Sequence, residues 1–153
     1  MVKGKICFVF YVSTVPLFAA PFTDLGDGTV RDQRTNLVWQ KCSQGVSGTG
    51  CATGSVVTST WVNALAYCNG LTLAARAWRL PSANELASIV DRNYFSPAID
   101  VNFFPGTALS RYWSSSTFQY TVSEAWFVNF TAGDRYNATK VTAYPVRCVA
   151  TGP

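Results

Sequence analysis

The chain has no histidine, few charged residues (13% of 153) and no long run of cationic residues. The missing histidine removes the commonest general base from any catalytic scheme. Beyond residue 20 the ten cationic residues, eight of them arginine, are scattered and exceed the acidic residues by only two. This mild excess argues against a nucleic-acid partner. The apolar run Ile6–Val15 is too short for a stable membrane span.

Cysteines are the most informative residues that the chain does contain. Cys7 lies in the apolar N-terminal stretch, and Cys42, Cys51, Cys68 and Cys148 make an even set in the remainder. An even set in an exported domain is typical of a disulfide-stapled binding or structural module. Four cysteines allow three pairings, and a Cys42 to Cys51 bridge would close the Gly-, Ser- and Thr-rich loop at 43–59.

The N-terminus has the order of a secretion signal. Lys3 and Lys5 precede the apolar run, and Pro16 to Ala20 follows it as a cleavage region. We expect a signal peptide at 1–20, one domain at 21–153, and a protein that is secreted to the periplasm or the cell surface. The alternative is that residues 1–20 are retained as an amphipathic anchor.

The first part of the domain has the pattern of a β-hairpin. The Asp27-Gly28 pair predicts a tight turn within 22–32, and a second short strand is predicted at 37–42. The aspartates of this region, Asp24, Asp27 and Asp32, lack the spacing of a calcium loop, so we assign them to turns and expect no metal site.

Two helices are predicted next. Trp61, Ala64, Leu65 and Cys68 share one helical face, which predicts a helix that starts after Ser59 or Thr60 and stops at Gly70. A capping box, with Ser82 at the N-cap and Glu85 three residues on, predicts a second helix that runs through Asp91. Glu85 therefore has a structural role rather than a catalytic one.

The last part of the chain is predicted to be a long loop followed by strands. The loop covers 92–110, and strands are expected at 112–117, 125–131 and 144–149. Alternation in the second strand places Trp126, Val128 and Phe130 on one face. All five tryptophans are expected to be mainly in the core of an α+β fold, with two short helices packed on small antiparallel sheets.

Several segments, in order, resemble one known family. The chain is similar to the Lcl C-terminal domain family of bacterial collagen-like adhesins at Gly26 to Asp32, Leu37 to Lys41, Trp61 to Cys68, Trp78 to Pro81 with Glu85 and Leu86, Tyr112 to Ser115, Ala125 and Trp126 with Phe130, and Val146 to Val149. The resemblance implies a C-type-lectin-like fold in which a cysteine of the first helix, here Cys68, bridges to one of the final strand, here Cys148.

The resemblance also implies an adhesin-like role. The best-known member carries this domain beneath a trimeric collagen-like stalk and binds sulfated polysaccharides, whereas this sequence contains no collagen-like triplets. Calcium-dependent sugar binding is not expected, because the Glu-Pro-Asn and Trp-Asn-Asp signatures of calcium-dependent lectins are missing. An anionic or sulfated glycan is therefore the expected ligand, without a cofactor.

Arginines, a lysine and tyrosines of the second half are the candidate ligand-binding residues: Arg92, Arg111, Tyr120, Arg135, Tyr136 and Lys140. For each residue the alternative is a solvated charge or a packed ring. A different function, a structural or protein-recognition module of a bacterial surface or pilus assembly, stays open.

Catalysis is not expected. A formylglycine-generating oxidase family with a related fold uses cysteines, but here the four cysteines beyond residue 20 are assigned to bridges. The remaining carboxylates, Asp91, Asp100, Glu124 and Asp134, form no recognisable pair.

Overall fold

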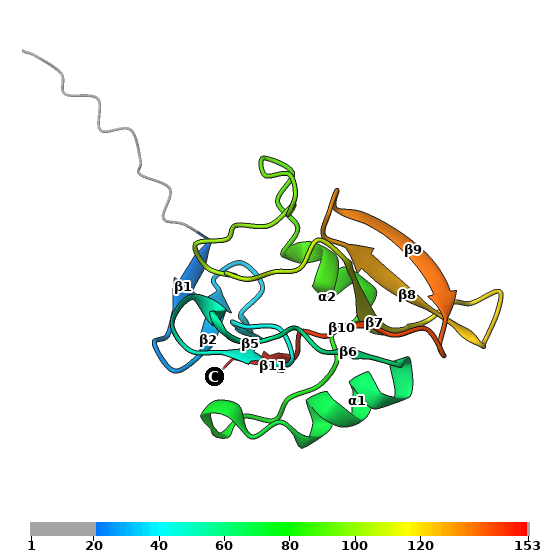
Figure 1. Ribbon diagram of the computed structural model, residues 1–153, viewed down its shortest axis with the longest axis horizontal. Helices are drawn as coiled ribbons and strands as arrows, with labels where there is room; N and C mark the ends of the chain where they lie inside the picture. The colour runs from blue at the N-terminus through cyan, green and yellow to red at the C-terminus, as the bar shows by residue number, and fades with distance from the viewer. Residues whose placement is uncertain (1–20, 153) are drawn as a thin grey trace, which may run out of the picture.

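Small antiparallel sheets and two helices make up residues 21–152, the part of the chain that the structure, a computed structural model, describes (Figure 1). The predicted signal peptide at 1–20, with Cys7, lies outside the described residues. The α+β class and the two helices are confirmed. No helix within 21–152 is long and apolar enough to cross a membrane.

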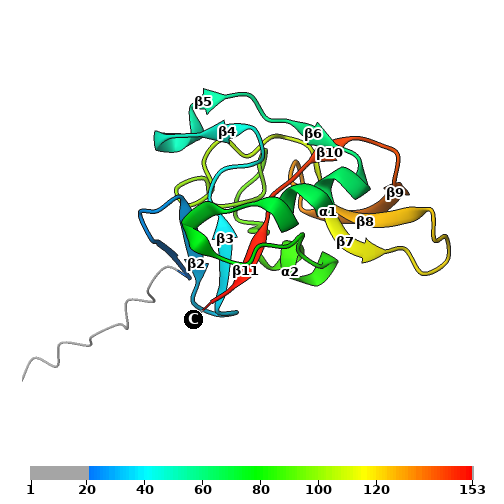
Figure 2. The same ribbon diagram turned by 90° about the horizontal axis from the view of Figure 1, so that it is seen from below.

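The first sheet has four strands in the order β1-β2-β3-β11, all antiparallel. Their bounds are Phe22–Asp24, Thr29–Asp32, Leu37–Gln40 and Val149–Thr151. The predicted hairpin is confirmed: Asp27 Oδ1 accepts the Thr29 amide at 3.1 Å, and Gly28 adopts a φ of 86°. Figure 2 shows β11 beside β3, so the C-terminal strand forms the edge of this sheet opposite β1.

The second sheet has three strands, β7 (Arg111–Thr117), β8 (Glu124–Asn129) and β9 (Asp134–Thr139). Strand β9 was not predicted. Its sequence is polar and lacks apolar alternation because it is an edge strand whose residues are all exposed or half-buried. It pairs with β8 along six consecutive positions.

Helix α1 covers Trp61–Gly70, as predicted, and helix α2 covers Ala83–Ser88. The capping box is confirmed, because Ser82 Oγ accepts the Glu85 amide at 3.2 Å and Glu85 Oε2 accepts the Ser82 amide at 2.8 Å. The prediction that α2 runs to Asp91 was wrong. The Asp91 amide donates to the carbonyl of Ala98 in the long loop, which replaces the helical hydrogen bond.

Both faces of each main sheet contribute to the core, so alternate residues of its inner strands enter two core clusters. On one face Val30, Trp39, Tyr112 and Val128 pack with residues of α2 and the long loop. On the other face the cluster contains Val38, Trp113, Phe127 and residues of α1. The two helices therefore cover opposite faces, α2 above and α1 below in Figure 1.

Two short ladders complete the fold. Strand β4 (Val46–Ser47) pairs with β5 (Thr53–Gly54), and β6 (Thr58–Ser59) pairs with β10 (Tyr144–Pro145). Short 3-10 turns lie at Thr49–Cys51 and Leu73–Ala75. The single last strand predicted at 144–149 was wrong: β10 and β11 belong to different sheets. Between β10 and β11 the Val146 carbonyl accepts the Gln44 amide and the Cys148 carbonyl accepts the Gln40 amide. These hydrogen bonds hold the segment that connects the two sheets.

Both predicted disulfides are present. Cys42 is bonded to Cys51 across nine positions, and Cys68 on α1 is bonded to Cys148, just before β11, across 80 positions. All four described cysteines are therefore oxidised, and the longer bridge ties α1 to the C-terminal strand through the core.

Arg147 is fully buried beside the shorter bridge. Its Nη2 donates to the Lys41 carbonyl, Ser43 Oγ and Thr107 Oγ1 at 3.1–3.3 Å, and burial lowers its pKa. The rings of Phe104 and Tyr112 lie over the guanidinium. This arginine is part of the core and leaves seven for surface roles.

Candidate functional site

A groove runs between the start of α2 and the face of the β7-β8-β9 sheet that α2 covers. Its volume is about 550 Å³, and its polar and aromatic lining includes Asn84, Ser116, Thr117, Gln119, Trp126 and Arg135. A smaller hollow of about 380 Å³ continues past Arg135 and is lined by Asn84, Arg92, Gly133 and Arg135, among others. We call the two together the sheet groove.

Strand register explains why these side chains meet. Arg135 pairs with Val128, and Asn137 pairs with Trp126, so all four side chains share one face of the sheet. Arg135 Nη1 donates to Asn84 Oδ1 on α2 at 2.8 Å, and this contact marks the join between the two hollows. Ser116 Oγ accepts the amide of Ala83 at 3.0 Å, which holds the N-terminus of α2 against β7.

Trp126 corrects one of the core predictions. Trp39, Trp78 and Trp113 are buried as expected, but Trp61 and Trp126 are only partly buried. The alternation placed Trp126 on the correct face, together with Val128 and Phe130. Helix α2 has only six residues, however, and leaves the part of this face around Trp126 uncovered.

Two further rings, the half-buried Phe118 and the exposed Tyr120, continue the aromatic surface from Trp126. The ring of Phe118 lies 5.2 Å from Trp126 and 5.4 Å from Tyr120, centroid to centroid, with edge-on geometry in both pairs. Tyr120 is 81% exposed. These three residues form an aromatic row at one end of the sheet groove, and the arginines lie at the other.

The charged residues that line the sheet groove without an oppositely charged partner are arginines. Within residues 21–152 neither Arg92 nor Arg135 has a carboxylate within 4 Å. Glu85 on α2 is neutralised by Arg79, whose two guanidinium nitrogens each lie 2.7 Å from a carboxylate oxygen. This pairing with Arg79 lowers the pKa of Glu85 to about 2. Near Trp126, the Glu124 carboxylate accepts a hydrogen bond from the Asn137 side chain. This carboxylate would repel an anionic ligand.

The other predicted site residues lie elsewhere. Arg111 and Tyr136 are on the opposite face of the sheet, where the Arg111 guanidinium stacks 5.1 Å from Phe127 and donates to the Tyr144 hydroxyl at 3.0 Å. Lys140 Nζ lies 4.1 Å above the Trp61 ring and donates to Thr117 Oγ1. The predicted cations thus form no single cluster: only Arg92 and Arg135 come together.

Sequence reasoning missed the polar half of the sheet groove. Asn84 and Gln119 were not singled out, although Asn84 is an exposed residue of the first turn of α2, directly beside the capping box. The capping box could have indicated Asn84, because it predicts a short helix, and the face of such a helix opposite its buried residues is exposed to solvent.

Carboxylates outside the groove have local roles. Asp91 Oδ1 accepts from Asn93, and Asp100 Oδ1 accepts from Asn102, each within its own turn. Within residues 21–152 no three Cys, Asp or Glu side chains come together as a group that could hold a metal ion.

The architecture and the groove define a disulfide-stapled α+β domain with a cationic and aromatic surface groove. The chain belongs to the Lcl C-terminal domain family, whose model matches residues 28–150. This match covers both disulfides, both helices and the whole sheet groove. No curated protein matches the chain.

Proposed function

We propose that this protein is an exported, non-catalytic, adhesin-like surface module that binds anionic glycans, sulfated ones above all, in the sheet groove. The single observation that carries the proposal is the placement of two arginines without carboxylate partners, Arg92 and Arg135, in one groove with the partly exposed Trp126. Family membership supports the adhesin-like surface role.

The chemistry of the groove suits a sulfated sugar chain. Guanidinium groups present paired donors that match the oxygens of sulfate or carboxylate. Aromatic faces such as Trp126 and Tyr120 offer flat apolar surface to sugar rings. The amide and hydroxyl groups of Asn84, Gln119 and Ser116 are donors and acceptors for sugar hydroxyls. We propose that the sugar chain lies along the groove from the aromatic row to Arg92.

The context of the domain agrees with this role. Disulfides persist in oxidising compartments, which supports export to the periplasm or the cell surface after cleavage of the segment 1–20. The link from the first helix to the final strand, Cys68 to Cys148, supports assignment of the fold as C-type-lectin-like. A lone domain of this kind binds each glycan site weakly, so avidity depends on how many copies are displayed.

Binding of a heparin oligosaccharide, measured by calorimetry for the domain and its variants, tests the proposal. Arg135→Ala and Trp126→Ala should each weaken binding by about tenfold, because each removes a contact worth roughly 1.5 kcal/mol. Arg111→Ala is the matched arginine control on the opposite face and should bind normally. A chelator should have no effect.

Equal losses in Arg111→Ala and Arg135→Ala would mean that the polymer attaches through net charge alone and would contradict the proposed groove. Loss of binding on chelation would contradict the metal-free mechanism.

A protein partner is the second candidate function. Val62, Val122 and Val141 are 64–82% exposed, and Lys140 links the segments that carry them, because its Nζ donates to the Val122 carbonyl and its own carbonyl accepts the Trp61 amide. Exposed apolar residues that gather at one site mark protein contacts. Absence of glycan binding, together with a bacterial surface partner that is lost in Val141→Lys, would favour this structural or protein-recognition role.

A further inference from the structure

Another hollow lies beside the Cys42–Cys51 bridge, away from the sheet groove. Its volume is about 580 Å³, which is within the range of small-molecule sites. The hollow is bounded by the β1-β2 turn, the end of β3, the loop at 46–50 and the C-terminal end of α1 with the segment after it. We call it the bridge hollow. It shares no lining residue with the sheet groove, so a ligand bound here would be independent of glycan binding there.

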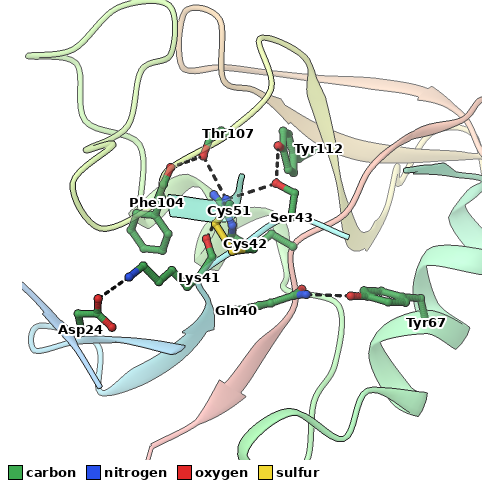
Figure 3. Close-up of a disulfide and its surroundings, with 11 residues drawn as sticks. Asp24, Gln40, Lys41, Cys42, Ser43, Cys51, Tyr67, Phe104, Thr107 and Tyr112 are labelled. Atoms are coloured by element: carbon green, nitrogen blue, oxygen red, sulfur yellow. Dashed lines mark hydrogen bonds and ion pairs between the residues drawn. A yellow bond between two sulfur atoms is a disulfide. The ribbon is translucent and has the colours of Figure 1, made fainter. Parts of the chain in front are cut away.

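At one end of the bridge hollow a phenol is held in place by a buried amide. Gln40 Nε2 donates to the Tyr67 hydroxyl at 2.8 Å (Figure 3), and Gln40 Oε1 accepts the Cys148 amide at 3.2 Å. The Tyr67 oxygen therefore accepts from Gln40, and its own hydrogen has no acceptor among residues 21–152. Burial raises the pKa of Tyr67, so the hydroxyl keeps that hydrogen at neutral pH. This end of the hollow presents a neutral donor.

An ammonium group marks the other end. Lys41 Nζ lies 2.5 Å from Asp24 Oδ2, and Figure 3 shows this pair on the opposite side of the bridge from Gln40 and Tyr67. The hydrogen bond from Lys41 lowers the pKa of Asp24, which is consistent with a stable ion pair. An ammonium group has three donors, and Asp24 uses one of them. Lys41 can therefore bind a second carboxylate.

Between the two donors much of the lining is apolar or carries no side chain, and Ser47 and Thr49 add two hydroxyl groups. Leu71 and Leu73, both half-buried, line the hollow together with Val46, and glycines line the side of the β1-β2 turn. At Gly26 no atom lies within 4 Å of the position that a Cβ would take, so this side is open to a ligand. The Cys42–Cys51 bridge holds the loop that forms the opposite wall.

We propose that the bridge hollow binds an acylated apolar amino acid with a free carboxylate. The carboxylate accepts from Lys41, the apolar side chain packs on Leu71 and Leu73, and the acyl carbonyl accepts from the Tyr67 hydroxyl. A free N-acyl amino acid and the C-terminus of a peptide share this chemistry. The net charge of the Lys41–Asp24 pair is zero, so the ligand is selected by shape and by a single anionic group rather than by polyanionic character.

The probe is N-acetyl-Ala-Leu, titrated into the uniformly ¹⁵N-labelled domain while amide chemical shifts are followed. Shifts should be confined to residues of the bridge hollow, and the matched amide N-acetyl-Ala-Leu-NH₂ should bind about tenfold more weakly, because it cannot pair with Lys41. A ten-residue peptide that ends in the same two residues separates the sources. Equal affinity would indicate a chain end, and much weaker affinity would indicate a free N-acyl amino acid.

Variants identify the contacts. Lys41→Gln should weaken binding by about tenfold and Tyr67→Phe by roughly threefold, whereas Asp24→Asn should strengthen it because a competing carboxylate is removed. Ser47→Trp should abolish binding by filling the hollow from an exposed position. Lys140→Gln is the matched lysine control and should bind normally. Each variant's amide spectrum reports its folding, and Tyr67→Phe keeps the ring and its packing.

The proposal is overturned if the acid and the amide bind equally, if shifts appear outside the bridge hollow, or if correctly folded Lys41→Gln and Tyr67→Phe bind like the unmodified domain. No binding at millimolar probe would overturn it as well. None of these outcomes bears on heparin binding in the sheet groove, which is measured with separate variants.

Discussion

The sheet groove and the bridge hollow differ in what forms their walls and in how their charges are arranged. The sheet groove lies on regular structure, a helix and a three-stranded sheet, and its arginines have no carboxylate partners within residues 21–152. The bridge hollow is walled by a turn, a loop and the ends of β3 and α1, and its lysine is paired with Asp24. A covalent bond holds that loop in place.

This difference shows how one small domain can hold two kinds of surface. Hydrogen-bonded strands and a capped helix place side chains without covalent help, so the sheet groove depends on the stability of the core. A loop that contains little apolar side chain cannot order itself by burial and needs a bridge. Unpaired charges act over a longer range than a paired one, so the two surfaces should respond differently to salt.

The largest effect is expected from removal of the longer disulfide, on which both surfaces depend. Cys68→Ala with Cys148→Ala should lower the free energy of unfolding by about 4.5 kcal/mol, because this bridge closes a loop across 80 positions in the unfolded chain. Urea unfolding measures the change, and both binding activities should fall with it. A loss below about 1 kcal/mol would contradict the role of this bridge as the main covalent support of the core.

Removal of the shorter disulfide should affect binding at the bridge hollow but not at the sheet groove. Cys42→Ala with Cys51→Ala should cost about 2.7 kcal/mol, because this loop spans only nine positions. Where the double variant is still folded, binding of N-acetyl-Ala-Leu should be lost and heparin binding kept. Loss of heparin binding with an intact fold would show that the two surfaces are coupled.

Acid should weaken the support of the sheet groove, because Glu85 caps the helix that forms one wall. The folded-state pKa of Glu85 is about 2, below its ordinary 4.5, so the carboxylate stabilises the fold above pH 4.5. That stability should be lost as the pH falls from 4.5 toward 2. Urea unfolding at a series of pH values should show the decline.

Two substitutions at Glu85 test this assignment. Glu85→Ala should cost about 0.5–2 kcal/mol at neutral pH, as other lost caps do. Glu85→Gln should keep most of the cap but show a weaker dependence on acid. If Glu85→Ala abolished heparin binding without a change in stability, Glu85 would be a ligand-binding residue instead.

The smallest effect is expected from salt. Raising the ionic strength from about 0.05 M to about 0.5 M should weaken heparin binding by at least tenfold, and N-acetyl-Ala-Leu binding by roughly threefold or less. Calorimetry at several salt concentrations provides the comparison. Equal salt dependence at both surfaces would contradict the distinction between unpaired and paired charges.

Local features of the sequence were sufficient for much of the fold. The hairpin at Asp27-Gly28, the cap formed by Ser82 and Glu85, and the helix through Cys68 depend on residues close together in the chain, and short-range hydrogen bonds decide them. The pairing of Cys68 with Cys148 came from resemblance to the family, since four cysteines alone allow three pairings.

Contacts between distant segments decided the rest, because burial of one element depends on what another covers. Strand β9 is a strand only because β8 offers it an edge. Nothing in the local sequence distinguishes Arg147 from the surface arginines, yet the segments that carry Lys41 and Thr107 enclose it in the structure. Trp126 stays open because α2 ends after six residues, and Arg92 meets Arg135 in one groove although they are far apart in sequence. The residue types were determined by the sequence, but which charges and rings face a ligand was determined by packing across the sheets.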